Sequence, residues 1–378
     1  MIAKRRRSAF FLLLIPLIGA AFSTSAQSWD PVLQVSAWGT AQEEGNWQLV
    51  SRIQPGVGLE FPAAIPGNWD ARVDYVLNGY KDRYDQDFSR EFYRWWIRLS
   101  GAQYELRAGL QKINFGPGFL LRPLMWFDGL DPRDPLQITR GVKGLLGRYY
   151  FLNNANLWAW MLYDNTEPHG WDILDGHPRK PEWGGRLQFP AIGGELGFSA
   201  NRRYVRFNPL GELFIEYPEY KFGIDGRWDV VVGLWFEAVT ARQDLQTLLP
   251  LADPYQQFLM GGTDYTFPLG NGLHLLGEHM AVSLSRDFSL WDNPFQVSAV
   301  SVDYPVGLLD RVSLFVLRNW DADNWTLYGN WTTTTDRWQL VTSLFRYPRS
   351  STVAFVPGGS TTRNNYGFGG RLMLILNL

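Results

Sequence analysis

Apolar and polar residues alternate along several short stretches of this chain. In the stretch 93–100, Tyr93, Trp95, Ile97 and Leu99 fall on one face, and Arg94, Trp96, Arg98 and Ser100 fall on the other. The stretches 103–111, 195–201 and 219–227 show the same period of two, with full charges on one face only. Successive side chains of a β-strand point to opposite sides, so this pattern predicts strands with one polar and one apolar face.

Turn-forming residues divide these stretches into hairpins. Short links rich in Gly, Asn and Pro occur at 62–69, 100–103, 152–156, 190–195, 225–229, 268–272, 306–311 and 334–338. Longer polar stretches lie near 80–90, 112–143, 165–183, 203–218, 242–254, 284–294 and 347–365. Short turns at one end and long loops at the other are typical of outer-membrane β-barrels. With one further strand at 31–40 and one at 367–378, the pattern predicts about 18 strands, and 16 is the alternative.

The C-terminal segment 369–378 places Leu372, Leu374, Leu376 and Leu378 on one face. An exposed edge strand of this kind is normally covered or interrupted in a soluble protein. An even number of antiparallel strands lets the last strand pair with the first, so that no edge remains and the leucines face lipid. A secreted β-sandwich or β-helix would explain the alternation but not this terminal row. The predicted fold class is therefore all-β, a transmembrane antiparallel β-barrel.

The N-terminal residues indicate the compartment. Residues 4–7 are basic, residues 9–22 are largely apolar, and small residues follow up to Ala26. This layout predicts a signal peptide over 1–26 that is cleaved on secretion across the inner membrane. An uncleaved membrane anchor is the alternative. We expect residues 27–378 to form one barrel domain in the cell outer membrane, in contact with its lipid.

Composition supports a membrane barrel and excludes some partners. Aromatic residues make up 16% of the chain, and tryptophan and tyrosine fall near many predicted strand ends, as in the aromatic girdles of membrane barrels. There is no cysteine, so disulfides and a lipid-anchored cysteine are excluded. Removing residues 1–26 leaves 31 of 35 basic residues and all 37 acidic ones, a net charge of −6. We therefore expect no nucleic-acid partner.

The predicted inner face is rich in arginine, because residues 27–378 contain 26 Arg and only 5 Lys. The candidate pore-lining residues are Arg94, Arg98, Glu105, Arg107, Arg148, Arg186, Arg203 and Arg227. One interpretation is structural, with cross-strand ion pairs that stiffen the wall. The other is an arginine ladder that attracts anionic solutes. We favour the structural interpretation for any single arginine and the ladder for the cluster within 92–111.

The segment 112–143 fits a barrel strand least well. It contains four prolines and many apolar residues, so it is neither regular structure nor typical of disorder. We expect it to fold inward as a constriction loop, and a cap outside the barrel is the alternative. Its acids should meet lumen arginines while its own arginines add positive charge to the constriction. The residues concerned are Arg122, Asp128, Asp131, Arg133, Asp134 and Arg140.

The sequence RWWIRLSGAQYELRAGLQKINFG (94–116) is an arginine-bearing hairpin that leads into a glycine-marked loop. It resembles bacterial porin-like barrels of the alginate-export type. The order of strands is similar over the whole expected mature chain, and the motif itself is similar over residues 92–118. The resemblance implies an eighteen-stranded outer-membrane channel that passes an anionic polysaccharide, with Arg94, Arg98 and Arg107 along the path. This chain departs from that type by ending in Leu378 instead of phenylalanine and by mixing acids with the lumen arginines.

The predicted function is a passive outer-membrane channel, a porin, for hydrophilic solutes that include anions or saccharides. The alternative is a non-transport barrel that serves as a scaffold for surface polysaccharide or another envelope complex; a homo-oligomer is open in either case. A surface lipase using His279, Ser283 and Ser285 on one outward strand face is a third hypothesis. Motifs of metalloproteases, serine hydrolases and phosphate-binding loops are missing, so we predict no enzyme activity, no cofactor and no metal site.

Overall fold

The computed structural model describes residues 28–61, 67–172, 174–207, 214–243, 254–289, 291, 294–348 and 367–378. The expected signal peptide lies outside these residues, as do large parts of the expected loops 242–254 and 347–365. Within the described ranges the chain forms long antiparallel strands and one turn of 3-10 helix, η2 (Glu43–Gly45). No helix in these ranges is long and apolar enough to cross a membrane.

The described residues contain 18 long strands and a two-residue strand, β8 (Asp175–Gly176), which pairs with β10. The long strands are β1 (Ser28–Gln42), β2 (Trp47–Phe61), β3 (Asn68–Asp82), β4 (Gln86–Ser100), β5 (Tyr104–Gln111), β6 (Val142–Tyr150), β7 (Asn156–Leu162), β9 (Glu182–Ala191), β10 (Gly194–Phe207), β11 (Ile215–Asp229), β12 (Gly233–Gln243), β13 (Tyr255–Phe267), β14 (Leu273–Ser285), β15 (Phe295–Pro305), β16 (Asp310–Asn319), β17 (Asn324–Thr334), β18 (Trp338–Arg346) and β19 (Phe368–Asn377). Each pairs with its neighbour along the chain, and β7 pairs with β9.

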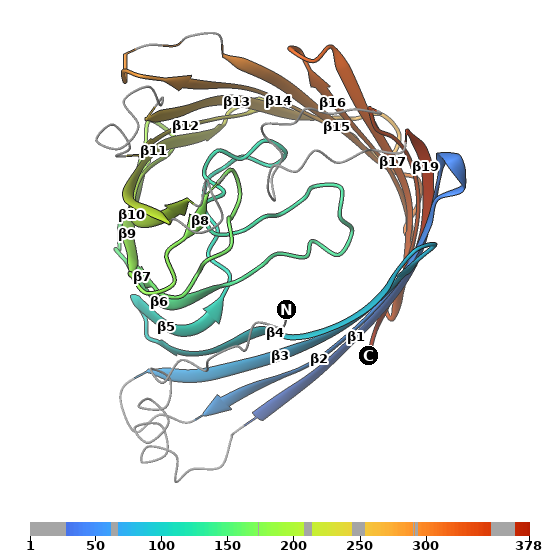
Figure 1. The fold of residues 1–378 in the computed structure, drawn as a ribbon, viewed down its shortest axis with the longest axis horizontal. Helices are drawn as coiled ribbons and strands as arrows, with labels where there is room; N and C mark the ends of the chain where they lie inside the picture. The colour runs from blue at the N-terminus through green and yellow to red at the C-terminus, as the bar shows by residue number, and fades with distance from the viewer. Residues whose placement is uncertain are drawn as a thin grey trace.

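The barrel closes because β19 pairs with β1. Leu372 lies opposite Gly39 and Leu374 lies opposite Ala37, so the backbone of the last strand is paired on both sides (Figure 1). The side chains of Leu372 and Leu374 are 55% and 41% exposed on the outer surface. The predictions of a closed antiparallel barrel and of 18 strands are both confirmed.

The outer surface of the wall is apolar along most of the strands. Many outward positions carry a large exposed hydrophobic side chain, as at Leu106, Leu145, Leu187, Leu259, Leu314 and Leu344. Exposed tryptophans lie at strand ends: Trp47 and Trp338 begin β2 and β18, and Trp325 is the second residue of β17. Alternation with an aromatic rim is the pattern expected of a wall surrounded by lipid.

Two predicted connections differ from the structure. The stretch 80–90 is not a loop, because β3 and β4 continue to residues 82 and 86. The Asp82 carboxylate accepts backbone hydrogen bonds from Tyr84 and Asp85, both at 2.7 Å, and so closes a tight turn with polar residues. The predicted turn at 225–229 is also wrong, because β11 runs to Asp229 and the turn is formed by residues 230–232.

A β-bulge in β4 places the Tyr93 side chain on the opposite face of the strand from the one that alternation predicts. Asp74 of β3 pairs with Arg94, whereas the next residue, Tyr75, pairs with Phe92, so Tyr93 has no partner of its own. The extra residue brings Tyr93 to the same side as Arg94, and both contact Thr139 inside the barrel. Bulges re-aim side chains in this way. Period-two alternation across this position therefore assigned Tyr93 to the wrong face.

We expect Leu374→Arg to lower the stability of the folded barrel in lipid vesicles by about 2 kcal/mol, because it places a charge on the lipid-facing wall. The matched control is Leu308→Arg in the exposed turn between β15 and β16, which should cost little. Urea unfolding of vesicle-inserted protein, followed by tryptophan fluorescence, measures the difference. Equal effects of the two substitutions would contradict a lipid-facing position for Leu374.

Candidate functional site

The connection between β5 and β6, residues 112–141, runs inside the ring of strands and not over its rim (Figure 1). We call residues 112–141 the inner loop. It contains neither helix nor strand, so its backbone N–H groups need partners elsewhere. Two wall carboxylates supply several of them.

Glu237 of β12 is fully buried and accepts two of these hydrogen bonds. Its carboxylate oxygens lie 2.7 Å from the backbone nitrogen of Gly118 and 2.8 Å from that of Leu124. A Cβ atom at Gly116 or Gly118 would lie 2.5 or 2.9 Å from Glu237 Oε1. Gly116 also has a φ of +91°, in the region that favours glycine. Glycine is therefore required for the backbone to approach this carboxylate so closely.

Glu278 of β14 accepts the next three backbone N–H groups of the loop. Phe119, Leu120 and Leu121 donate to it at 2.8, 2.8 and 2.5 Å. The indole Nε1 of Trp235 donates to the same carboxylate at 2.9 Å. We call Glu237 and Glu278 the loop clamp. Together they accept hydrogen bonds from five backbone N–H groups of the loop. An apolar wall would leave these groups unpaired, at a considerable cost in folding free energy.

The far end of the inner loop is held at the bulge in β4. The Arg94 guanidinium donates to the backbone carbonyl and to the hydroxyl of Thr139, both at 2.9 Å. The backbone N–H of Thr139 donates to the hydroxyl of Tyr93 at 3.4 Å. The guanidinium of Arg94 lies 4.1 Å from the centre of the Tyr93 ring. The bulge thus supplies both groups that fix this end of the loop.

Between these anchors the inner loop packs an apolar face against the wall. Its buried residues are Ile113, Phe115, Leu121, Leu124, Trp126 and Phe127. The Phe115 ring stacks on Trp160 of β7 at 5.7 Å and meets Trp126 edge-on at 5.5 Å. The Phe119 ring lies 5.3 Å from that of Trp235. Apolar burial therefore fills part of the space inside the barrel, and the loop is fixed by packing as well as by hydrogen bonds.

The charged residues of the inner loop pair mainly with each other and not with the wall, which corrects one expectation. Asp128 lies 3.4 Å from Arg122, and Asp131 lies 2.7 Å from Arg133. Asp134 accepts backbone hydrogen bonds from Leu136 and Ile138 at 3.1 and 3.0 Å. Arg140 pairs with Glu167 of the next connection. The expectation that these acids meet lumen arginines is therefore wrong for Asp128, Asp131 and Asp134.

Burial affects the charges at the start of this loop. Asp128 is buried, and burial raises the pKa of its carboxyl in spite of the nearby Arg122 and Lys112. Burial also lowers the pKa of the Lys112 ammonium. Arg122 and Asp128 form a buried ion pair, so Arg122 presents no free guanidinium to the interior surface, contrary to its expected role.

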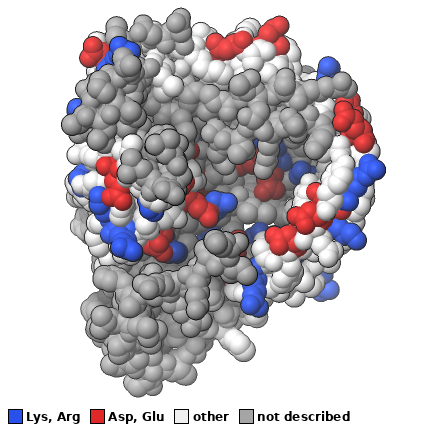
Figure 2. Space-filling view, viewed as in Figure 1, with Lys and Arg blue, Asp and Glu red and all other residues white. Residues whose placement is uncertain are grey.

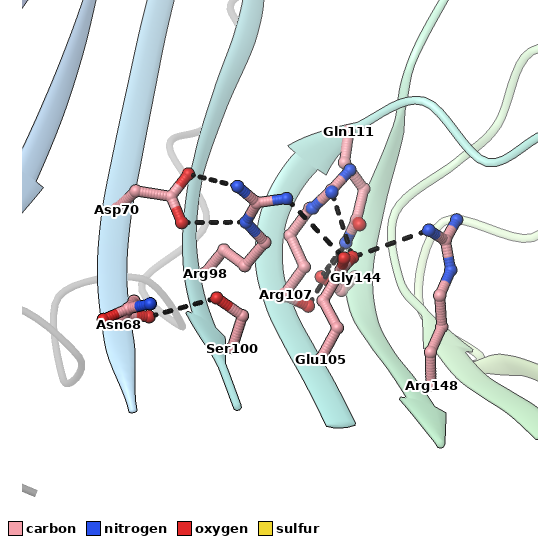
Figure 3. Close-up of polar contacts among 9 residues, drawn as sticks. All are labelled: Asn68, Asp70, Arg98, Ser100, Glu105, Arg107, Gln111, Gly144 and Arg148. Atoms are coloured by element: carbon pink, nitrogen blue, oxygen red, sulfur yellow. Dashed lines mark hydrogen bonds and ion pairs between the residues drawn. The ribbon is translucent and has the colours of Figure 1, made fainter. Parts of the chain in front are cut away.

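A polar surface lies on the neighbouring wall strands β3 to β6. We call Asp70, Arg98, Glu105, Arg107 and Arg148 the basic wall (Figure 3). Arg98 forms a bidentate pair with Asp70, at 2.8 and 2.9 Å. Glu105 lies 2.9 Å from Arg107 and 3.6 Å from both Arg98 and Arg148. Three arginines thus share two carboxylates, which leaves one net positive charge.

The strand register explains this arrangement. Arg98 lies directly opposite Arg107, a like-charge pair that is unfavourable without compensation. Asp70 is directly opposite Arg98 on the other side, and Glu105 is directly opposite Arg148. Tryptophan rings support the guanidinium groups: Arg107 lies 4.8 Å from the Trp96 ring and Arg148 lies 3.8 Å from the Trp158 ring. The charges are therefore held in place yet remain partly exposed.

The other candidate pore-lining arginines do not form an open ladder. Arg94, Arg186 and Arg203 are 8%, 3% and 5% exposed, so the expectation that they line a water-filled path is wrong. Arg203 is paired with Glu219 at 2.6 Å and with Asp172 at 2.8 Å. Arg227 is partly exposed and pairs with Asp229 at 3.0 Å. For these four residues the structural interpretation describes the side-chain environment better.

Arg186 of β9 reaches Asp225 of β11 across the intervening strand β10. The two side chains meet at 2.6 and 2.8 Å. Gly197 of β10 lies opposite Asp225, and a Cβ atom there would be 2.3 Å from the Arg186 guanidinium and 2.4 Å from the Asp225 carboxylate. This buried pair exists only because position 197 has no side chain.

The loop clamp was not recognised from the sequence. Both carboxylates lie at inward positions of their strands, and a carboxylate that accepts backbone N–H groups carries no motif in the sequence. The structure also removes the proposed lipase arrangement. His279 is exposed and hydrogen-bonded to Ser298 at 2.8 Å, whereas Ser283 and Ser285 are buried. These three residues therefore do not share an exposed face.

Comparison with known proteins supports the fold. No protein-family model matches the chain, and no curated protein matches its sequence. Among solved structures, Pseudomonas aeruginosa OccK5 (OpdH) has a TM-score of 0.56 at 11% identity, over 93% of this chain and 98% of that one. Escherichia coli Wzi, described as a carbohydrate-binding β-barrel involved in group 1 capsule assembly, has a TM-score of 0.53 at 12% identity, over 99% and 89%.

A third match is Vibrio cholerae OmpT in its trimer form, with a TM-score of 0.52 at 10% identity, over 94% of this chain and 100% of that one. At these identities the likeness concerns the fold alone. The chain therefore has the fold of outer-membrane β-barrels.

We expect Glu237→Ala to loosen the inner loop, because it leaves the N–H groups of Gly118 and Leu124 without their acceptor. Each unpaired group costs about 1–3 kcal/mol of free energy. Hydrogen–deuterium exchange of the refolded barrel should then be about tenfold faster or more in peptides covering 116–124. The control is Glu195→Ala, which removes an exposed inner-face carboxylate that does not contact the loop. Unchanged exchange in Glu237→Ala would contradict the clamp.

Proposed function

We propose that this protein is a passive outer-membrane channel for hydrophilic solutes whose path is narrowed by the inner loop. The observation that carries the proposal is the combination of a closed barrel with a polar, partly exposed inner wall beside a clamped loop. Solvent-exposed charges on an inner face are stable only where water reaches them. In the view down the barrel, the surface is hollowed beside acidic and basic side chains (Figure 2).

The basic wall is the part of the interior best suited to contact a solute. Its arginines are partly exposed, and its spare positive charge favours anions over cations of the same size. The rings of Trp96 and Trp158 pack against the guanidinium groups of Arg107 and Arg148 and hold them in position for a solute. Anionic or saccharide solutes are therefore the proposed class, and transport needs no chemistry at the site.

A second candidate function rests on the packing of the inner loop. Its aromatic cluster fills part of the interior, so the barrel is a possible scaffold for surface polysaccharide, without transport. The carbohydrate-binding role stated for Wzi, which shares the fold, supports including this candidate. The two functions differ in whether the isolated barrel conducts ions.

Single-channel recording in planar bilayers under a salt gradient distinguishes them. We expect discrete steps and a reversal potential of the sign produced by anion preference, reduced in Arg107→Gln. The control Arg202→Gln removes an arginine that stacks on Trp183, Tyr204 and Tyr220, away from the basic wall, and should leave the potential unchanged. A folded barrel that shows no steps would refute the channel and favour the scaffold.

The narrowing role of the inner loop has its own test. Deletion of residues 119–136 removes the three backbone donors to Glu278 and most of the buried apolar residues of the inner loop. We expect the deletion variant to fold, because the strand pairing is untouched, and to conduct more ions per open channel. Conductance equal to that of the full chain would show that the loop does not limit the path.

A further inference from the structure

The connection between β7 and β9, residues 163–181, also turns into the ring of strands, where it meets the inner loop (Figure 1). We call it the second connection. At its start, the side-chain amide of Asn165 exchanges hydrogen bonds with the backbone of Lys143 on β6, at 2.9 and 3.0 Å. Near its end, β8 pairs with β10. Gly170 and Trp171 lie between these two attachments.

Gly170 and Trp171 contact the backbone of the inner loop. The indole Nε1 of Trp171 donates to the backbone carbonyl of Arg122 at 2.8 Å, and its buried ring lies 5.8 Å from that of Phe258 on β13. Gly170 has a φ of +55°, and a Cβ atom there would lie 1.7 Å from the carbonyl oxygen of Met125. Glycine is therefore required for the two backbones to approach so closely.

The loop clamp and the second connection hold the same part of the inner loop through different backbone groups. Glu237 and Glu278 accept hydrogen bonds from the N–H groups of residues 118–121 and 124. Trp171 donates to a carbonyl that lies between these donors in the chain. The clamp is built on wall strands, whereas Trp171 lies on a connection and needs an anchor of its own.

Asp172, the next residue, supplies this anchor. Its carboxylate lies 2.8 Å from Nη1 of Arg203 on β10 and also contacts Nζ of Lys221 on β11. Both cations are buried, and they share a second carboxylate, that of Glu219, at 2.6 and 3.7 Å. Removing one partner from a buried group of ion pairs is strongly unfavourable, because it leaves charge uncompensated. The wall therefore holds Asp172 firmly in place.

We propose that Asp172 is a positioning residue of the channel. Its ion pairs with Arg203 and Lys221 fix Trp171, and Trp171 fixes the part of the inner loop that narrows the path. The buried charges of β10 and β11 thus serve the position of the loop and not a contact with solute. The effect on conduction rests on the proposed function, whereas the position of the loop can be measured without conduction.

Electron paramagnetic resonance of a spin-labelled inner loop tests the proposal. The chain has no cysteine, so a single introduced cysteine carries the label. Gly129 is a suitable position, because a Cβ atom there meets nothing within 4 Å. In the Gly129→Cys barrel refolded into lipid vesicles, we expect Asp172→Asn to raise the population of the mobile spectral component about fivefold or more.

Two further variants separate the position of the loop from the stability of the wall. Trp171→Phe removes the indole N–H and keeps the wall ion pairs, and it should mobilise the label in the same direction. It also carries the test if Asp172→Asn does not fold, as judged by β-sheet circular dichroism. Asp172→Glu retains the carboxylate and should restore most of the immobile component.

The matched controls leave the contact between the two segments intact. Asp175→Asn changes an exposed acid of the same connection. Trp331→Phe removes an indole hydrogen bond to Asp310 on the outer wall. Both should give the spectrum of the unmodified chain. In planar bilayers we expect larger or fluctuating conductance steps in Asp172→Asn and Trp171→Phe, and unchanged steps in the two controls.

Two results would overturn the role of Asp172. An unchanged label spectrum in both Asp172→Asn and Trp171→Phe means that the clamp alone positions the loop. Equal mobilisation in Asp175→Asn means that any change in the second connection loosens the loop.

The proposed function fails in a different way. A mobilised label with unchanged conductance confirms the positioning of the loop by Asp172 and refutes its narrowing of the path. A folded barrel without conductance steps refutes the channel, and the label spectra alone then decide the role of Asp172.

Discussion

The structure depends on the rule that backbone N–H and C=O groups away from water need hydrogen-bond partners. In the wall this rule requires closure, and the pairing of β19 with β1 provides it, so that every long strand among the described residues is paired on both sides. The leucines of the last strand can then face outward without creating a site of aggregation.

The same rule acts a second time inside the barrel. The inner loop has no regular structure, yet it packs apolar side chains against the wall and so loses contact with water. Glu237 and Glu278 replace that water by accepting the backbone N–H groups of residues 118–121 and 124. At the other end Arg94 donates to the Thr139 carbonyl, and Tyr93, which a bulge turns to the same side, accepts the Thr139 backbone N–H. The loop is consequently a fixed part of the interior, and the basic wall on β3 to β6 retains its exposure to solvent.

The sequence was sufficient to predict properties that repeat along the chain. Alternation and turn composition predicted the barrel, its 18 strands and the facing of the terminal leucines. Properties that depend on two distant segments were not accessible. The loop partners of Glu237 and Glu278 lie more than a hundred residues away and are backbone groups, which leave no mark on composition. The burial of Arg186 depends on the missing side chain of Gly197, and the facing of Tyr93 depends on a bulge. Each of these is a local exception to the period of two.

The central claim is that the clamped inner loop sets the width of a water-filled path. The most direct measurement is the single-channel conductance and current noise of the double variant Glu237→Ala/Glu278→Ala beside the unmodified barrel. The account predicts a larger or strongly fluctuating conductance in the variant. Five backbone N–H groups of the loop lose their carboxylate acceptors, while the strands of the wall remain paired. Identical, quiet conductance steps in both proteins would contradict it.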